Sequence, residues 1–125
     1  MATILIIDDN PDNMMLFRTL LALKGHRVVE RSDGAGLLAA LDEIKPDLTL
    51  MDIQLPERDG FALLKDIRGS AHRELRVLAL TAHAMASDVE RARQAGFDGY
   101  LTKPIDVRRF PELVARALTG ERVEE

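Results

Sequence analysis

Polar side chains suited to phosphoryl chemistry stand at the C-terminal ends of four short apolar runs. Asp8 and Asp9 follow the first run, Asp52 the second, Thr81 the third and Lys103 the fourth. A carboxylate can attack a phosphoryl group, and neighbouring carboxylates can hold a magnesium ion. A hydroxyl and an ammonium can bind the phosphoryl oxygens during transfer. Together the five side chains indicate a magnesium-dependent site that accepts a phosphoryl group.

The elements that must position these groups are predicted from apolar runs that alternate five times with amphipathic helical patterns. This alternation is typical of a parallel sheet covered by helices on both faces. Ligands bind such sheets outside the carboxyl ends of the strands, where all five side chains would meet. The strands are expected near residues 3–8, 27–31, 47–52, 76–81 and 98–102.

Each candidate residue can be given a chemical role from its type. Asp52 is the best candidate for the nucleophile, with Asp8 and Asp9 beside it. Two carboxylates about 4 Å apart repel by roughly 4 kcal/mol at an effective dielectric constant near 20, and a magnesium ion would remove that cost. Lys103 would balance the charge of the phosphoryl oxygens, and the Thr81 hydroxyl would donate a hydrogen bond to one of them. A single aspartate at a strand end is usually a turn or capping residue, so the interpretation depends on the whole set.

Length, composition and charge restrict the class of protein. The chain has 125 residues, of which 46% are hydrophobic, and no cysteine, which fits one globular domain without disulfides or thiolate metal sites. Its net charge is −4, from 17 basic and 21 acidic residues, and the acidic excess is mostly the three site aspartates. We therefore expect no nucleic-acid partner. No signal peptide or apolar segment of about 20 residues is evident, so we expect a cytoplasmic protein without membrane insertion.

Candidate N-cap residues precede the five expected helices, namely Asn10, Asp33, Asp59, Ser87 and Asp106. In the last segment, Pro111 follows the expected cap by five residues and would remove a helical hydrogen bond. Either the fifth helix is kinked there, or its regular part begins near residues 110–111. The domain is expected to span residues 1–119, and the polar residues 120–125 are expected to form a frayed tail.

These motifs together resemble a response-regulator receiver domain, the CheY-like domain of two-component signalling, over essentially the whole chain. The resemblance implies a (βα)5 doubly wound, flavodoxin-like fold with a five-stranded parallel sheet in the order 2-1-3-4-5. The matching segments are the acidic pocket at 8–10, the phosphoacceptor loop at 51–56 with Asp59 and Gly60, the Leu80-Thr81-Ala82 segment and Lys103-Pro104.

The resemblance assigns more specific roles to the site residues. It implies that Asp52 is phosphorylated and that Mg²⁺, or Mn²⁺, is held by Asp9, Asp52 and the backbone carbonyl of Gln54. Asp8 would act through a metal-bound water. The peptide bond between Lys103 and Pro104 is expected to be cis.

Further residues match positions that control switching and phosphate lifetime in this family. Thr81 is expected to be the switch threonine, followed by the small Ala82, and Tyr100 the aromatic switch residue. A half-buried strand tyrosine with its hydroxyl in water is the alternative for Tyr100. Gln54 and His83 match two positions that tune dephosphorylation, although an ordinary exposed loop histidine is the simpler interpretation of His83.

The chain ends after the fifth expected helix, which predicts a stand-alone response regulator whose output is protein binding. The resemblance implies a sensor histidine kinase or histidine phosphotransferase as donor and a target at the face formed by helix 4, strand 5 and helix 5. We expect a monomer before phosphorylation, with dimerisation afterwards left open. We expect no enzymatic activity beyond magnesium-dependent self-phosphorylation and self-dephosphorylation. The motifs are similar to DivK-type cell-fate regulators and also to receivers fused to hybrid kinases.

Three alternatives remain from the residues alone. A small aspartyl-phosphate phosphatase of the haloacid dehalogenase type would need a second acid where Gln54 stands. A flavodoxin-like electron carrier would need a hydroxyl-rich phosphate loop, whereas residues 8–11 read Asp-Asp-Asn-Pro. A phosphate-independent scaffold with a receiver fold is the third alternative.

Overall fold

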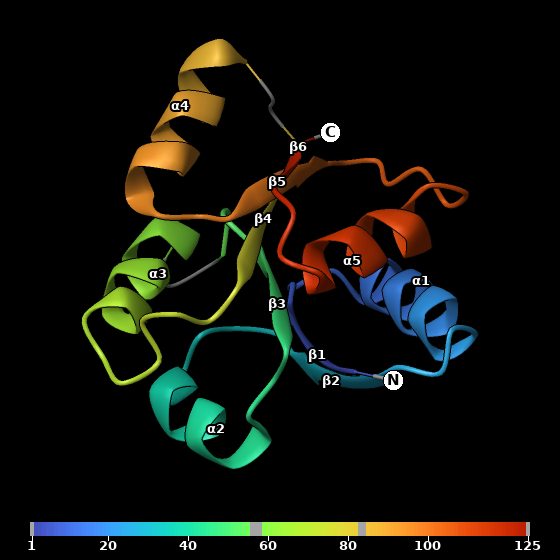
Figure 1. The fold of residues 1–125 in the computed structure, drawn as a ribbon, viewed down its shortest axis with the longest axis horizontal. Coiled ribbons are helices and arrows are strands. Elements are labelled where there is room, and N and C mark those ends of the chain that lie inside the picture. The colour runs from blue at the N-terminus through green and yellow to red at the C-terminus, as the bar shows by residue number, and fades with distance from the viewer. Residues whose placement is uncertain (1, 56–58, 83–84, 125) are drawn as a thin grey trace.

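The computed structural model describes residues 2–55, 59–82 and 85–124, and its centre is one parallel sheet (Figure 1). The sheet has six strands in the order β2-β1-β3-β4-β5-β6, all paired in parallel. The predicted order of the first five strands is confirmed, but the prediction of five strands is wrong because a short sixth strand is present. The strands are β1 (Thr3–Ile7), β2 (Arg27–Arg31), β3 (Leu48–Asp52), β4 (Val77–Thr81), β5 (Gly99–Thr102) and β6 (Val123–Glu124).

Helices cover both faces of the sheet, as a doubly wound fold requires (Figure 1). Helices α1 and α5 pack on one face, and α2, α3 and α4 lie on the other. No described helix has the length and apolar character needed to cross a membrane. The helices are α1 (Pro11–Ala22), α2 (Leu37–Ile44), α3 (Gly60–Arg68), α4 (Ala86–Ala95) and α5 (Phe110–Leu118).

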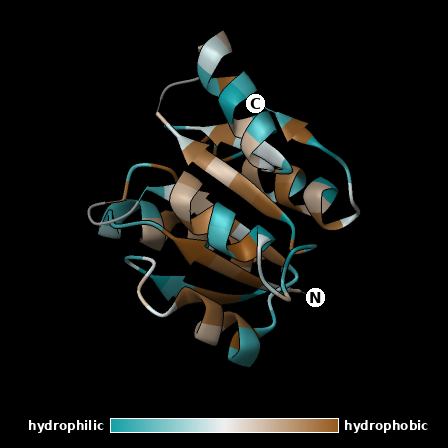
Figure 2. Cartoon of the chain, turned by 90° about the vertical axis from the view of Figure 1, so that its left-hand side faces the viewer, coloured by the Kyte–Doolittle hydropathy of each residue, from teal (hydrophilic) through white to brown (hydrophobic). Residues whose placement is uncertain are grey.

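The core consists of two apolar layers, one on each face of the sheet (Figure 2). Alternate residues of a strand point to opposite faces. In β1, Ile4 and Ile6 therefore pack with the α1 and α5 layer, whereas Leu5 and Ile7 pack with the α2, α3 and α4 layer. All four side chains have no exposed surface, which explains why this strand reads as a continuous apolar run.

Two of the predicted helix caps are confirmed. The Asn10 side chain accepts hydrogen bonds from the backbone N–H groups of Asp12 and Asn13, and this fixes the start of α1 just after the first strand. Asp59 accepts from the backbone N–H of Ala62 at 2.8 Å and caps α3. Both helices therefore begin beside the carboxyl edge of the sheet, close to the expected site.

The predicted caps of the second and fourth helices are wrong. Asp33 accepts a hydrogen bond from the N–H of Ala35, so it closes a local turn, and α2 begins only after Gly36 at φ 65°. Ser87 lies inside the first turn of α4, which begins at Ala86 after a Met85 that makes no side-chain cap. In both places a short polar side chain fits a turn or a first helical turn as well as a cap.

The segment around Pro111 follows the second alternative, because the regular helix begins at Phe110. Pro111 lies in the first turn of α5, where its missing N–H has no intrahelical partner to lose. Asp106 does not cap α5 directly. Its carboxylate accepts from the N–H groups of Arg108 and Arg109, at 3.0 and 3.4 Å, and so organises the turn before the helix.

Residues 123–124, expected to belong to a frayed tail, instead form the short strand β6. Gly120 has a φ of 98° in the left-handed region, which glycine adopts without strain, and this turns the chain back toward the sheet. Val123 is then 1% exposed and pairs with Gly99 of β5. The apolar side chain of Val123, in an otherwise polar tail, accounts for the order of this segment.

Candidate functional site

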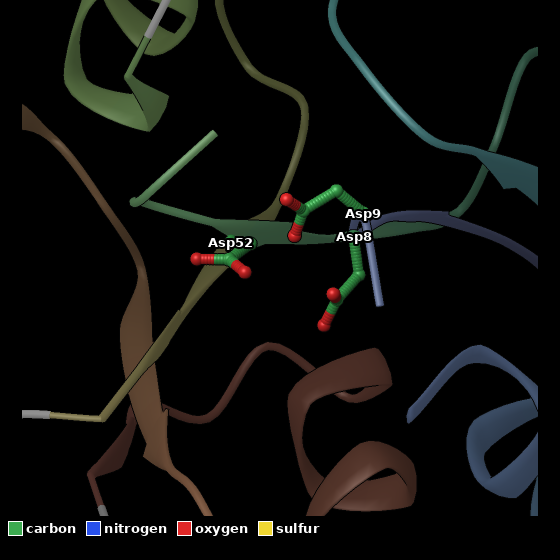
Figure 3. Close-up of side chains that lie close together, drawn as sticks. All are labelled: Asp8, Asp9 and Asp52. Atoms are coloured by element: carbon green, nitrogen blue, oxygen red, sulfur yellow. The ribbon is translucent and has the colours of Figure 1, made fainter. Parts of the chain in front are cut away.

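The predicted site residues meet at the carboxyl edge of the sheet. Strand β3 ends at Asp52, and Asp8 and Asp9 follow β1, which pairs with β3 in register. Figure 3 shows the three carboxylates close together at the ends of these strands. One oxygen of each lies within 4.8 Å of the others. The convergence of Asp8, Asp9 and Asp52 is therefore present in the structure.

Two of the three carboxylates are buried and oriented by the backbone. Asp8 is 2% exposed and Asp52 is 5% exposed, whereas Asp9 is exposed. One oxygen of Asp8 accepts from the backbone N–H of Asn10 at 2.9 Å, and one of Asp52 accepts from that of Gln54 at 2.8 Å. In each case the donor lies two residues after the aspartate. The second oxygen of each carboxylate, Oδ2, is left to face the site.

Lys103 supplies the positive charge that these carboxylates need. Its Nζ atom lies 2.8 Å from Asp52 Oδ2 and 3.0 Å from Asp8 Oδ2. Burial by itself would lower the pKa of Lys103, but the hydrogen bond to Asp52 and the nearby Asp8 outweigh it and raise the pKa above its ordinary value. The side chain therefore remains an ammonium at neutral pH.

The backbone around Lys103 explains how this side chain reaches the site. Its N–H donates to the carbonyl of Thr81 at 2.7 Å, which extends the pairing of β4 and β5 by one residue. The peptide bond between Lys103 and Pro104 is cis, and this prediction is confirmed. From this position at the end of β5, the Lys103 side chain reaches both Asp8 and Asp52.

The donor set suits a hard divalent cation. Three carboxylates from two adjacent strand ends offer oxygen ligands at one place. Asp8 Oδ2 is fully buried and, despite the ammonium of Lys103 nearby, has no well-aligned hydrogen bond. A buried carboxylate oxygen without such a bond is costly unless a cation satisfies it. The residues present therefore fit a magnesium ion beside Asp9 and Asp52, with the Asp8 carboxylate facing the same place.

Thr81 and Tyr100 lie on neighbouring strands beside this site. Thr81 is 6% exposed and ends β4, with Thr102 of β5 opposite it in register. Tyr100 is half-buried and packs with the layer beneath α4. A small, largely apolar cavity lies between Thr81 and Tyr100, walled by Ile53, Ala79, Asp88, Val89 and Ala92. The gap on the α4 side of the threonine holds no more than about one water molecule, so Tyr100 packs close to Thr81.

The remaining sequence candidates are not all described. The Gln54 and Ala82 residues are exposed, on loops next to the site. His83 lies outside the described residues, so its role stays a prediction. The sequence reasoning missed the two backbone donors, Asn10 and Gln54. The signal that could have found them is their spacing, because an aspartate side chain commonly accepts from the residue two positions later.

A shallow depression next to the site was also missed. The residues that line it are Ile53, Gln54, Asp59, Phe61, Thr81, Asp88 and Arg91. The Arg91 guanidinium lies 3.9 Å from the centroid of the Phe61 ring, which joins α4 to α3. No local pattern signals this contact, because the two residues belong to different helices.

Fold and site together define a class, namely doubly wound α/β domains with an acidic pocket beside a lysine at the carboxyl edge of the sheet. The chain belongs to the response regulator receiver domain family, which matches residues 4–115. Domains of this family act as phosphoacceptor switches in two-component signalling, and they bind Mg²⁺ at an acidic pocket.

Individual relatives support the same assignment. The polar-differentiation response regulator DivK of Brucella anthropi is 42% identical over 113 residues, which cover 90% of this chain and 92% of the relative. A LuxR-family two-component response regulator from an Aurantimonas species superposes with a TM-score of 0.88 at 30% identity, covering 98% of this chain and 88% of the other. The receiver domain of a Pseudomonas aeruginosa sensor histidine kinase, solved with magnesium in its active site cleft, has a TM-score of 0.84 at 32% identity. The match covers 94% of this chain and 98% of that domain.

Proposed function

We propose that this chain is a stand-alone response regulator that accepts a phosphoryl group on Asp52 and changes its protein contacts as a result. The observation that carries the proposal is the buried Asp52, with one oxygen fixed by the Gln54 N–H and the other 2.8 Å from the Lys103 ammonium. A phosphohistidine of a sensor histidine kinase or a histidine phosphotransferase would be the donor. Small phosphodonors would serve as well, and the protein would also dephosphorylate itself.

Transfer would proceed by attack of a carboxylate oxygen of Asp52 on the donor phosphorus. The bond between phosphorus and the donor nitrogen breaks, and the donor imidazole keeps the electron pair and takes up a proton. The Gln54 N–H holds Oδ1 of Asp52, so Oδ2 is the oxygen available for attack. Lys103 then neutralises the transferred group, and Thr81 donates a hydrogen bond to it.

A divalent cation completes the site in this proposal. Asp9, Asp52 and the backbone carbonyl of Gln54 would bind Mg²⁺ directly, and Asp8 would act through a bound water. Mn²⁺ would substitute because it prefers the same oxygen ligands. When bound, the ion supplies positive charge to the phosphoryl oxygens and removes the repulsion between the carboxylates.

Output would follow from a shift between two conformations. A phosphoryl group on Asp52 draws Thr81 toward the site, and the Tyr100 ring fills the space that the threonine vacates. The surface formed by α4, β5 and α5 changes as a result and binds a downstream protein. Ala82, Gln54 and His83 would adjust phosphate access and lifetime in this scheme.

The remaining assignments concern the state of the whole protein. We propose a single-domain regulator in the cytoplasm, and the match over 92% of the length of DivK supports the single-domain part of this proposal. We propose a monomer before phosphorylation, with a dimer of the phosphorylated form as an open outcome. No nucleic-acid partner is proposed. The family assignment does not favour the phosphatase, the flavodoxin-like carrier or the phosphate-independent scaffold.

The proposed function is tested by incubating the purified protein with a small phosphodonor and Mg²⁺ and measuring its intact mass. We expect the mass of one added phosphoryl group, and no adduct when EDTA removes the metal, because the carboxylates then repel the incoming phosphate. Partner kinases provide a second donor. Absence of a magnesium-dependent adduct from every donor would favour the phosphate-independent scaffold.

Replacing Tyr100 with alanine is expected to weaken the discrimination between phosphorylated and unphosphorylated protein by a partner, without preventing phosphorylation. Tyr100 lies beside Thr81 and is not one of the converging carboxylates, so its removal takes away the ring that would replace the moving threonine. Partner capture and intact mass, measured on the same sample, separate the two effects. Tyr100→Phe is the matched control, because it keeps the ring. Loss of phosphorylation in Tyr100→Ala would contradict the switch assignment.

A further inference from the structure

The outer edge of β5 is covered by the C-terminal strand of the same chain (Figure 1). Strand β6 pairs in parallel with β5, with Val123 opposite Gly99 and Glu124 opposite Tyr100. A Cβ atom on Gly99 would collide with the carbonyl oxygen of Val123, so glycine is required for this close approach. The edge is thus shaped to receive an extended segment.

The covering segment is anchored first by an aliphatic side chain. Val123 is 1% exposed and packs in the apolar layer that includes Phe110, Val114 and Ala117. Its socket is part of the body of the domain and lies directly beside the β5 backbone. Any segment that occupies this edge must therefore place a small apolar residue in the same position.

The second anchor is an acid held by α4. The Arg93 guanidinium donates two hydrogen bonds to the Glu124 carboxylate, at 2.6 and 2.8 Å. Arg122 of the tail itself adds a third at 2.9 Å. The hydrogen bond from Arg93 is the main cause of a pKa of Glu124 lowered to about 2, so the carboxylate is charged at neutral pH. Arg93 thus presents a cation next to the edge of β5.

The tail is attached in a way that permits exchange. Strand β6 has two residues, and the side chains of Arg93 and Glu124 are 49% and 22% exposed. Short strands with exposed ion pairs belong to the least stable parts of a structure. Gly120 joins the segment to α5, and a side chain there would meet nothing within 4 Å. Two more side-chain hydrogen bonds hold the tail, from Arg76 to the carbonyl of Glu121 and from Arg122 to the carbonyl of Phe97. None of these contacts belongs to the five longer strands or to the helices, so the tail can exchange while those elements stay paired.

A vacated β5 edge would offer unpaired backbone groups to another strand, which is a common mode of peptide recognition. We propose that this edge is a docking site for an extended segment of a target protein, carrying a branched aliphatic residue followed by an acidic residue, and that residues 121–124 are its intrachain competitor. The partner's aliphatic side chain takes the socket of Val123, and its acid binds Arg93. The proposal rests on the output face proposed above, and not on the chemistry at Asp52.

A fluorescent synthetic peptide with the sequence of residues 119–125 is the probe, and its binding to full-length protein is measured by fluorescence anisotropy. In the wild type the tail competes at a high effective concentration, so the peptide binds weakly. Glu124→Arg loosens the tail by repulsion from Arg93 and leaves the socket and Arg93 available. We expect the peptide to bind Glu124→Arg about tenfold or more tightly than wild type, because the protein's own tail no longer competes for the β5 edge.

Two further variants decide the outcome. Arg93→Glu removes the cation that recognises the acid and is expected to abolish peptide binding. Glu30→Gln is the control, because it breaks the Arg18–Glu30 ion pair of 2.8 Å on the opposite edge of the sheet. It should bind the peptide with the same affinity as wild type. If Glu124→Arg is poorly folded by circular dichroism, Val123→Thr loosens the other anchor with almost no change of shape. Equal binding to all folded variants, or no binding to a folded loosened one, would overturn the proposal. Intact-mass measurement of phosphorylation in each variant reports separately on the function at Asp52.

Discussion

Asp52→Asn is expected to abolish phosphorylation by every donor. The amide has nearly the same shape and can still accept the hydrogen bond of the Gln54 N–H, so the loop after β3 should be preserved. It cannot supply the carboxylate oxygen that attacks phosphorus, and one of the two charged partners of Lys103 is lost. The intact mass of Asp52→Asn should therefore show no phosphoryl adduct under conditions that label the wild type completely.

The control for this prediction is another aspartate with a similar local hydrogen bond. Asp33 accepts from the N–H of Ala35 and is not among the converging carboxylates, so Asp33→Asn should be phosphorylated like wild type. A residual adduct on Asp52→Asn, mapped by peptide mass spectrometry to Asp8 or Asp9, would show that another carboxylate of the pocket is the acceptor.

Lys103→Gln is expected to lower both the rate of phosphorylation and the stability of the metal-free protein. The ammonium is within 3.0 Å of two buried carboxylates, and its side chain is 18% exposed. Removal of one partner from a buried charge cluster leaves charges uncompensated, which typically costs about 3 kcal/mol of unfolding free energy. The loss of a cation from the transferred group should slow phosphorylation by roughly 100-fold.

The pH dependence of this stability difference follows from the raised pKa of Lys103. Because the folded pKa lies above the ordinary value of 10.5, the stabilisation is complete below that value and is lost only as the pH rises through the raised pKa. In urea unfolding, the free energy of unfolding of Lys103→Gln should therefore lie below that of wild type by a constant amount from pH 7 to 9. The difference should shrink above pH 10.5.

Added magnesium separates the electrostatic explanation from a packing defect. The ion supplies positive charge to the same carboxylates, so Mg²⁺ should stabilise Lys103→Gln more than wild type. Lys65→Gln, a change of an exposed lysine on α3, should leave stability and phosphorylation unchanged. Equal stabilisation of wild type and Lys103→Gln by magnesium would contradict the charge-compensation role.

Much of the fold follows from local patterns. The five expected strands agree with the structure to within one residue at each end, because each has apolar residues at its centre, bounded by polar or turn residues. Asn10 and Asp59 cap helices as expected, since each stands directly before an amphipathic segment. The predicted helix caps at Asp33 and Ser87 are wrong for the same reason. Short polar residues stabilise turns, caps and first helical turns alike, so neighbouring backbone geometry decides among them.

The sequence by itself determined which chemical groups stand at the strand ends, and a parallel sheet brings strand ends together because its strands share one direction. The gathering of Asp8, Asp9 and Asp52 follows from this, whereas the order of the first five strands was implied by the family resemblance. Only the tertiary structure decided that Lys103 bridges Asp8 and Asp52, that a backbone N–H orients each of these carboxylates, and that a sixth strand covers β5. These features depend on distances between segments far apart in the chain. The pairing of Val123 with Gly99 in particular arises from an apolar socket and a bare backbone edge, which no local periodicity encodes.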